Sequence, residues 1–374
     1  MALYFDNAAT TEPCDAAVNA YINALELYGN PSSSHKAGMA AHTALEKARQ
    51  TLAALVGCKA EELYFTASGT EANNTAIFGA AALMVRRSRR IVLTDSEHPS
   101  VAQCAKRLEA LGAELEYIST KGGRLDTAQL EAALKKPTAL VCVMAVNNET
   151  GAVYDLKAVR GAINRSGCGA ILHCDAVQGF MKRSDMKALL KYADTAAFSS
   201  HKLHAPRGVG ALMVRGGLKL SPYIYGGGQE RGLRSGTENV AGAVAFATAA
   251  SEYTAEKLAT VKTVRETLVG ALTEAGNVGF NVPAEHIDGI LNISLYGIKS
   301  ETALNCLSAQ EIYISASSAC SSKKGHSTVM EAYGLGKAEL ESALRIGISP
   351  YNTVDEARLL ASALIAARER YGRI

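Results

Sequence analysis

The feature that most constrains this chain is the regular alternation of short apolar runs with longer amphipathic stretches between about residues 36 and 215. Short apolar runs are typical of buried strands, and the stretches between them have helical periodicity. Such alternation predicts a mostly parallel sheet covered by helices on both faces. We expect strands at 63–66, 90–94, 114–118, 139–147, 170–175, 195–199 and 210–214, and helices at 70–85, 100–111, 127–134 and 155–164.

Residues capable of chemistry follow several of these strands. Ligands of open parallel sheets bind beyond the carboxyl ends of the strands, where such residues would meet. The first candidates are Gly69 and Thr70, at the step from the strand at 63–66 to a helix. Gly69 allows close backbone approach, Thr70 offers a hydroxyl, and the helix N-terminus favours a phosphate. A helix cap without any ligand is the alternative.

Two more candidates follow the next strands. His98 could stack on a flat cofactor and move protons, or it could simply precede a helix that begins with Pro99. Asn147 could hydrogen-bond a cofactor or a substrate, although asparagine-rich turns often have no function. Neither residue is specific by itself.

Asp175, Gln178 and Lys202 complete the series. A lysine that holds an aldehyde as a Schiff base, and a carboxylate that keeps a pyridine nitrogen protonated, are what pyridoxal 5′-phosphate (PLP) requires. Gln178 could reach the phenolic oxygen of that ring. Lys202 alone could equally be a solvated surface lysine. The order of all these residues at successive strand ends is what favours a PLP site.

The chain has eight cysteines and no C-x-x-C pair, so neither a disulfide framework nor a zinc site is indicated. Most lie in apolar surroundings and are interpreted as small buried hydrophobic residues. Cys320 differs, because small and polar neighbours favour an accessible loop. It is therefore a candidate sulfur nucleophile, and Lys323 and Lys324 beside it either stabilise a thiolate or keep the loop solvated.

The second part of the chain has a different pattern. After Gly226–Gly228 we expect one long helix from about 240 to 275, then strand character at 287–295, a helix at 301–307 and a final helix from about 354. We predict a large domain over 15–255, and a small α+β domain formed by 1–14 and 256–374. The small domain would carry the cysteine loop, at about 315–327.

The net charge of +3 is too small to indicate binding to nucleic acid or to a membrane surface. No apolar run approaches the roughly 20 residues of a spanning helix, and the first residues lack a signal-peptide pattern. We therefore expect a cytoplasmic protein with no direct contact to nucleic acid or membrane.

Longer motifs join these residues into a pattern that closely resembles the cysteine desulfurases of the NifS/IscS type, over essentially the whole chain. The motifs are DNAATT at 6–11, GNPSS at 29–33, SGTEANN at 68–74, NNETG at 147–151, HCDAVQ at 173–178, SHK at 200–202 and RSGTEN at 234–239. The resemblance implies a homodimeric fold-type I PLP enzyme of the class V aminotransferase family. Its expected fold is α/β, with a large mostly parallel-sheet domain and a smaller α+β domain.

The resemblance also implies roles by position. Lys202 matches the Schiff-base lysine, and His98 the ring-stacking residue and a proton donor or acceptor. Asp175 matches the partner of the pyridine nitrogen, and Gln178 that of the phenolic oxygen. The phosphate would be held at Gly69, Thr70, Ser199 and His201, with Thr237 donated across the dimer, and the substrate carboxylate by Asn147 and Arg345. An ordinary interdomain ion pair is the alternative for Arg345.

The implied reaction converts L-cysteine to L-alanine and leaves the sulfur as a persulfide on Cys320, in a loop that resembles the longer one of group I desulfurases. The sulfur would then pass to an acceptor protein, such as an iron–sulfur scaffold or a tRNA-thiolation enzyme. The sequence departs from the family at Ala205 and Arg207, where glycine and lysine are usual, so backbone strain at Ala205 is one expectation and a differently shaped turn the other.

Other functions remain open at this point. The same fold supports selenocysteine lyase, cysteine lyase and class V aminotransferase reactions, and Cys320 favours sulfur transfer over transamination. A non-enzymatic adaptor in sulfur trafficking is disfavoured by the joint presence of the candidate catalytic residues. A nicotinamide dehydrogenase is disfavoured because no G-x-G-x-x-G follows a strand.

Overall fold

The computed structural model describes residues 2–317 and 327–372. Its larger part is a sheet of seven strands, and all neighbours are parallel except that β8 is antiparallel to both β2 and β7. In spatial order they are β2 (Leu63–Thr66), β8 (Gly210–Val214), β7 (Thr195–Ser199), β6 (Ile171–Asp175), β5 (Leu140–Cys142), β3 (Arg90–Thr94) and β4 (Glu114–Ile118). The predicted α/β class with a mostly parallel sheet is confirmed.

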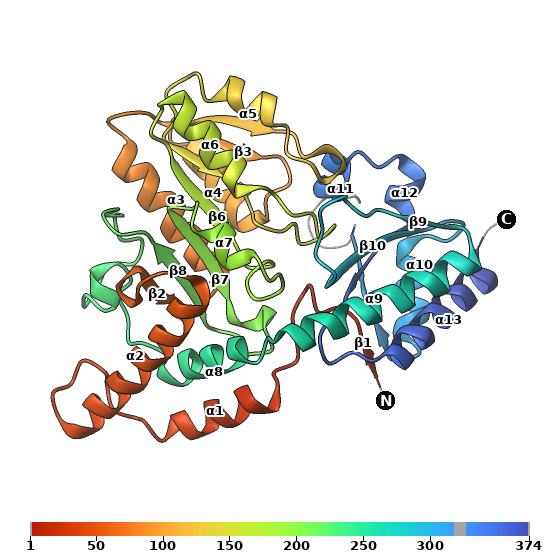
Figure 1. Ribbon diagram of the computed structural model, residues 1–374, viewed down its shortest axis with the longest axis horizontal. Helices are drawn as coiled ribbons and strands as arrows, with labels where there is room; N and C mark the ends of the chain where they lie inside the picture. The colour runs from red at the N-terminus through yellow and green to blue at the C-terminus, as the bar shows by residue number, and fades with distance from the viewer. Residues whose placement is uncertain (1, 318–326, 373–374) are drawn as a thin grey trace.

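Helices cover this sheet on both faces (Figure 1). Successive side chains of a strand point to opposite faces, so Ile91 and Leu93 pack in one core and Val92 in the other. The Ile91 side is covered by α3 (Gly69–Met84) and α4 (Pro99–Glu109). The Val92 side is covered by α2 (Lys36–Val56), α5 (Thr127–Ala133), α6 (Leu156–Ser166), α7 (Met186–Leu190) and α8 (Val240–Ser251), with α1 (Asp15–Leu25) packed on α8.

A second, antiparallel sheet has the order β12-β13-β10-β9. Its strands are β12 (Ser315–Ala316), β13 (Ala343–Gly347), β10 (Ile290–Leu295) and β9 (Val278–Phe280), and its helices are α9 (Ala255–Ala275), α10 (Ser300–Ser308), α11 (Thr328–Tyr333), α12 (Lys337–Ser342) and α13 (Val354–Tyr371). The N-terminal β1 (Leu3–Tyr4) pairs with β11 (Ile312–Tyr313), and Phe5 is buried in the core of this part. The chain therefore starts in the smaller part and crosses to the larger one. The proposed boundary at residue 255 stays a prediction.

The expectation of one helix over 240–275 is wrong. α8 ends at Ser251, and α9 begins after Thr254, whose side chain accepts a hydrogen bond from the backbone N–H of Lys257. A threonine at that position caps a new helix, because its hydroxyl satisfies an N–H that has no partner within the helix. The strand expected over 139–147 is also shorter, since β5 covers only Leu140–Cys142.

Ala205, which stands where the family usually has glycine, does not have the strained backbone that was one of the two expectations from the sequence. The left-handed residues of this turn are His204, with φ of 59°, and Gly208, with φ of 88°, whereas Ala205 is not among the residues with positive φ. Ala205 is instead buried against Ala17 and Ala245. The alanine is thus accommodated by a turn in which a neighbouring residue takes the unusual conformation.

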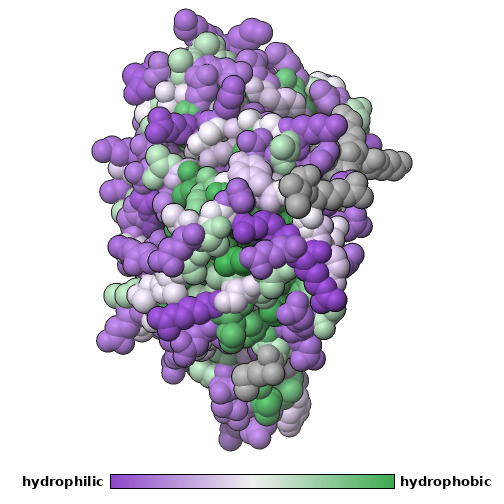
Figure 2. Space-filling view, turned by 90° about the vertical axis from the view of Figure 1, so that its right-hand side faces the viewer, coloured by the Kyte–Doolittle hydropathy of each residue, from purple (hydrophilic) through white to green (hydrophobic). Residues whose placement is uncertain are grey.

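Polar side chains cover much of the face formed by the smaller part, and apolar groups gather in patches towards its centre and lower end (Figure 2). Over the described ranges 2–317 and 327–372, no helix is long and apolar enough to cross a membrane.

Candidate active site

The site begins where neighbouring strands of the large sheet end. β6 ends at Asp175, and the adjacent β7 ends at Ser199, directly before a single helical turn formed by Ser200–Lys202. Because the two strands are parallel, both ends lie at the same edge. Asp175 and Lys202 are therefore brought to one place, as the sequence analysis predicted from their order.

The Lys202 amine contacts backbone rather than a carboxylate. Its Nζ donates to the carbonyl oxygens of Ala8, at 2.8 Å, and Ala9, at 2.5 Å. Burial, together with the charge of Arg345, lowers the pKa of Lys202 to about 8, and the charges of Asp175 and Asp6 act in the opposite direction. A larger fraction of this amine is thus unprotonated near neutral pH than for an ordinary lysine, which suits a nucleophile.

Asp175 is buried and held by a network. Its Oδ2 accepts from Asn73 Nδ2 at 2.7 Å, and its Oδ1 accepts from the backbone N–H of Val177 at 3.0 Å. Asn73 Nδ2 also donates to Ser100 Oγ, at 2.8 Å, while its Oδ1 faces the buried ring of His173 at 2.9 Å. Burial lowers the pKa of His173 to about 3, so this ring stays neutral. The role of Asn73 was missed, although it lies within the motif at 68–74.

The same network reaches His98. Ser100 donates its backbone N–H to His98 Nδ1 at 3.1 Å, and Ser100 Oγ lies 2.7 Å from the same nitrogen. Since Nδ1 accepts, the proton of the neutral ring is assigned to Nε2. Burial lowers the pKa of His98, as do Lys202 and Arg345, against the effect of Asp175. His98 is thus linked to Asp175 through two intermediate side chains, Ser100 and Asn73.

Gln178 lies one turn after Asp175 and is also buried. Its Nε2 donates to the Ala8 carbonyl at 2.8 Å, the same oxygen that Lys202 contacts. Its Oε1 accepts from Lys182 Nζ at 3.1 Å. Burial and, to a smaller extent, the charges of Lys202 and Arg345 lower the pKa of Lys182 to about 7. Lys182 was not among the site residues predicted from the sequence.

The predicted phosphate ligands lie at the start of α3 and after β7. A Cβ added to Gly69 would lie 3.3 Å from Ser199 Cβ and 2.7 Å from the Val177 side chain, so only glycine allows this close approach. Ser199 is buried and Thr70 is exposed. His201 Nδ1 lies 3.1 Å from Thr10 Oγ1. Burial and neighbouring cations lower the pKa of His201 to about 3, so it can serve as a neutral hydrogen-bonding group.

Arg345 connects the smaller part to the site. One of its terminal nitrogens lies 3.2 Å from Asp6 Oδ1, and the other donates to the Asn148 carbonyl at 3.2 Å. Its Nε is buried and has no hydrogen-bond partner within the described part of the chain. Arg345 thus forms an ion pair with Asp6, but the predicted boundaries place both residues in the small domain, so this is not the interdomain pair considered as the alternative, and one donor of the guanidinium stays unused.

The side chain of Asn147 forms hydrogen bonds within its own turn and to Ser96. Its Oδ1 accepts from the backbone N–H groups of Glu149 and Thr150, and its Nδ2 donates to the Ser96 carbonyl at 3.2 Å. Its role as a cofactor or substrate ligand stays a prediction. Thr237 is exposed and lines a small pocket with Thr66 and Arg234, and its role across a dimer likewise stays a prediction.

Cys320, Lys323 and Lys324 lie outside the described residues. The described residues on either side of this segment are Ser317 and Ser327, and both are linked to Glu149. Ser327 donates to Glu149 Oε2 at 2.7 Å. Ser317 is linked indirectly, because Asn292 donates to both Ser317 Oγ and the Glu149 carbonyl. Glu149 adjoins Asn148, which Arg345 contacts. Both ends of the segment that contains Cys320 therefore lie beside the Arg345 site.

The seven described cysteines have no disulfide partner, and four of them, Cys14, Cys104, Cys142 and Cys174, are buried. Burial raises the pKa of Cys104 to about 11 and those of Cys142 and Cys174 well above the usual value. These three thiols stay protonated at neutral pH and are poor nucleophiles.

The donors assembled here fit PLP. The site offers an amine of lowered pKa for the aldehyde, a buried carboxylate for the ring nitrogen and a glycine cradle beside Ser199 for the phosphate. Burial is the largest cause of the lowered pKa values of Lys182 and Lys202, and the positive charge of Arg345 lowers both as well, so an anionic ligand would relieve that repulsion.

Comparison with known proteins gives the same picture along the whole chain. The model of the aminotransferase class-V family matches residues 3–360. The "NifS/IcsS protein homolog" of Lactobacillus delbrueckii subsp. bulgaricus is 38% identical over 382 residues, with 100% of this chain and 98% of the relative covered. "Cysteine desulfurase IscS" of Actinobacillus succinogenes is 35% identical, with 98% and 94% covered. The solved structure of a NifS-like protein is 33% identical, with a TM-score of 0.92 over 99% of this chain and 100% of the other.

Proposed function

Since this chain belongs to the class-V aminotransferase family, and within it to the NifS/IscS-type cysteine desulfurases, we propose that it is a PLP-dependent cysteine desulfurase. It converts L-cysteine to L-alanine: the carbon–sulfur bond of the substrate breaks, and a sulfur–sulfur bond forms at Cys320. The electron pair of the carbon–sulfur bond stays on the carbon, which takes up the proton that the Cys320 thiol loses, so that one thiol and one cysteine become one persulfide and one alanine.

The observation that carries this proposal is the convergence of Lys202, Asp175 and Arg345 beside both flanks of the segment containing Cys320. An aminotransferase needs the first three groups but no thiol. The placement of Ser317 and Ser327 around Glu149 supports delivery of a thiol to the same site.

Each residue has a task that follows from its surroundings. PLP, when bound, supplies an electron sink. Asp175, fixed by Asn73, would hold the ring nitrogen protonated. Lys202, with its lowered pKa, would accept the α-proton of the substrate and return a proton. His98, with its proton on Nε2, would stack on the ring and donate a proton, and Arg345 would bind the substrate carboxylate through its unused donor.

The finer features of the function belong to the proposal. We propose a homodimer in which Thr237 contributes to the partner's phosphate site, and a protein acceptor of the persulfide sulfur such as an iron–sulfur scaffold or a tRNA-thiolation enzyme. A cytoplasmic location is part of the same proposal.

The test is product analysis of the purified protein, reconstituted with PLP and given L-cysteine and a thiol reductant. Equimolar alanine and sulfide are expected, and Cys320→Ala should keep the yellow colour of bound PLP while losing both products. Cys168→Ala, which replaces a half-buried thiol, is the matched control and should keep the activity. A yellow protein that makes pyruvate, or a Cys320→Ala protein that still forms persulfide, would contradict the proposal.

A further inference from the structure

Lys182 is a half-buried lysine at the site for which the proposed reaction has no task. It lies on the loop after β6, and its Nζ donates to Gln178 Oε1 at 3.1 Å. Gln178 in turn donates through Nε2 to the Ala8 carbonyl, which also accepts from Lys202. A continuous chain of contacts therefore joins Lys182 to the lysine that would hold the cofactor.

The contacts with Lys182 and with Ala8 together fix which way the Gln178 amide faces. A glutamine side chain has an acceptor end and a donor end of nearly the same shape, so its neighbours determine the orientation. In its protonated form Lys182 can only donate, so it selects Oε1, and the Ala8 carbonyl, which can only accept, selects Nε2 at the other end. The Nε2 end is then turned towards Ala8 and Lys202, and one of its two hydrogens remains for a ligand.

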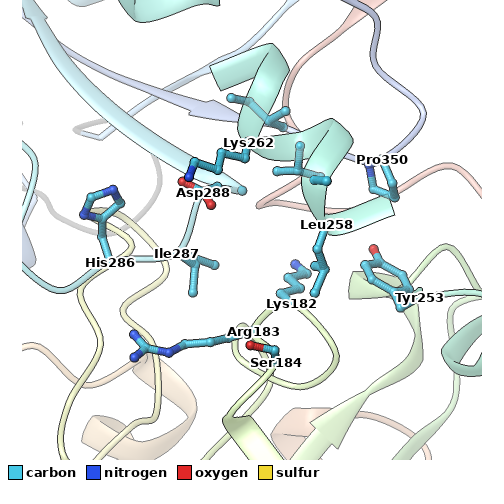
Figure 3. A pocket seen from close by; sticks show the side chains of 14 residues that line it. Lys182, Arg183, Ser184, Tyr253, Leu258, Lys262, His286, Ile287, Asp288 and Pro350 are labelled. Carbon is cyan, nitrogen blue, oxygen red and sulfur yellow. The ribbon is translucent and has the colours of Figure 1, made fainter. Parts of the chain in front are cut away.

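Lys182 lies beside a cavity of about 280 Å³ between the larger and the smaller parts. Figure 3 shows its side chain between Ile287 on one side and Leu258 and Tyr253 on the other. The cavity leaves room beside the amine for a larger cationic group. It also contains a second lysine, Lys262, whose side chain is 62% exposed and whose ion-pair partner is Glu266.

We propose that Lys182 is a positioning residue, which holds the Gln178 amide with its Nε2 donor towards the phenolic oxygen of the cofactor. This inference rests on the proposed function, because it assumes that PLP is bound at Lys202. A donor at the phenolic oxygen stabilises its anionic form and lowers the pH at which the lysine-bound cofactor loses its proton. Without Lys182 only the Ala8 carbonyl holds the amide in this orientation, so the amide turns more easily, and an acceptor facing the oxygen has the opposite effect.

The experiment measures the pH midpoint of the visible absorption change of the PLP-bound protein, in the absence of substrate. K182M should raise this midpoint by about one pH unit, a tenfold change in the proton equilibrium. K182R should restore the original midpoint, because a guanidinium is also an obligate donor and the cavity has room for it. K262M, which removes a cation from the same cavity without touching Gln178, should leave the midpoint unchanged.

A double-mutant cycle separates orientation from simple charge removal. Losing any cation near Lys202 favours a protonated cofactor and also raises the midpoint. If Lys182 acts through Gln178, Q178L raises the midpoint by itself, and in the Q178L background K182M adds only the smaller shift that loss of its charge produces. Fully additive shifts of the two substitutions would overturn the proposal.

Further outcomes are also decisive. An unchanged midpoint in K182M, with the yellow colour and product formation intact, would overturn the role of Lys182 and leave the proposed function standing. A wild-type protein that binds no PLP would overturn both. Thermal unfolding of the PLP-free variants identifies a folding defect, and K182A is the second removal variant if K182M does not fold.

Discussion

At the scale of single residues, the chemistry of this site depends on burial and on neighbouring charge more than on residue type. The amine of Lys202 is an ordinary lysine in sequence, yet burial and Arg345 bring its pKa to about 8. The carboxyl of Glu97, directly before His98, moves the other way: burial raises its pKa to about 8, and its Oε2 has no hydrogen-bond partner among the described residues. Burial thus makes the Lys202 amine easier to deprotonate, and the Glu97 carboxyl harder to ionise, than the same groups in water.

The lowered pKa of Lys202 gives a prediction for the PLP-free protein. Only the unprotonated amine attacks an aldehyde, so the rate of PLP uptake should rise with pH and level off above about 8, instead of rising to the ordinary lysine value near 10.5. Stopped-flow absorption would measure this rate.

Arg345→Met should move that profile to higher pH, because removal of a nearby cation makes protonation of Lys202 less costly. Arg358→Met removes an exposed cation of α13 that pairs with Asp355, and serves as the control. A profile centred near 10.5 in the wild-type protein would contradict the inferred environment.

At the scale of elements, the decisive contact is the approach of the start of α3 to the ends of β6 and β7. Gly69 is the first residue of α3, and an added Cβ would lie 2.7 Å from the Val177 side chain. Two carbon atoms less than 3.0 Å apart must move apart, so α3 can start at this position without a shift only if residue 69 has no side chain. The asparagine that holds Asp175, Asn73, lies one turn further along the same helix.

Gly69→Ala should therefore destabilise the protein by about 1–3 kcal/mol and weaken PLP binding, because it pushes α3 away from the site. Gly270→Ala is a matched control: Gly270 is exposed within α9 and an added Cβ would meet nothing within 4 Å. That change should stabilise the protein by about 0.5–1 kcal/mol, since alanine favours a helix. Urea unfolding and PLP titration would measure both effects, and equal effects of the two substitutions would refute the steric argument.

At the scale of the whole molecule, exposed apolar side chains gather on the outer helices of the larger part. Ile22 and Leu25 of α1 are each 56% exposed, and Met39 of α2 is 59% exposed. Exposed apolar surface of this kind favours association. It supports the proposed homodimer, in which Thr237 would serve the partner's site.

Mixed dimers test that arrangement. The Lys202→Ala homodimer should have reduced activity at limiting PLP because it lacks the lysine that would hold the cofactor. The Thr237→Ala homodimer should have reduced activity because it lacks a ligand for the cofactor phosphate. A heterodimer of the two variants should recover activity at one site, because one chain supplies Lys202 and the other an intact Thr237. Refolding the two variants together, and assaying PLP affinity and alanine production, would measure this recovery. Recovery that is absent despite heterodimer formation would place Thr237 in the site of its own chain.

The sequence by itself determined the α/β class, the family and, apart from the strand expected over 139–147, the strands of the large sheet almost to the residue. Short buried strands and periodic helices are local patterns, and motifs such as that at 173–178 are contiguous. The break between α8 and α9 was not predicted, because the cap at Thr254 is a weak local signal within a continuous apolar pattern.

The tertiary structure alone decided which side chains act on one another. The contacts of Lys202 with the Ala8 and Ala9 carbonyls, of Arg345 with Asn148, and of Asn73 with Asp175 join residues about 100 to 200 positions apart. The lowered pKa of Lys202 and the orientation of Gln178 by Lys182 depend on burial and on these distances. Neither the pKa nor the orientation can be read from a local run of residues, because both arise only when separate strands and the N-terminal segment meet at one edge of the sheet.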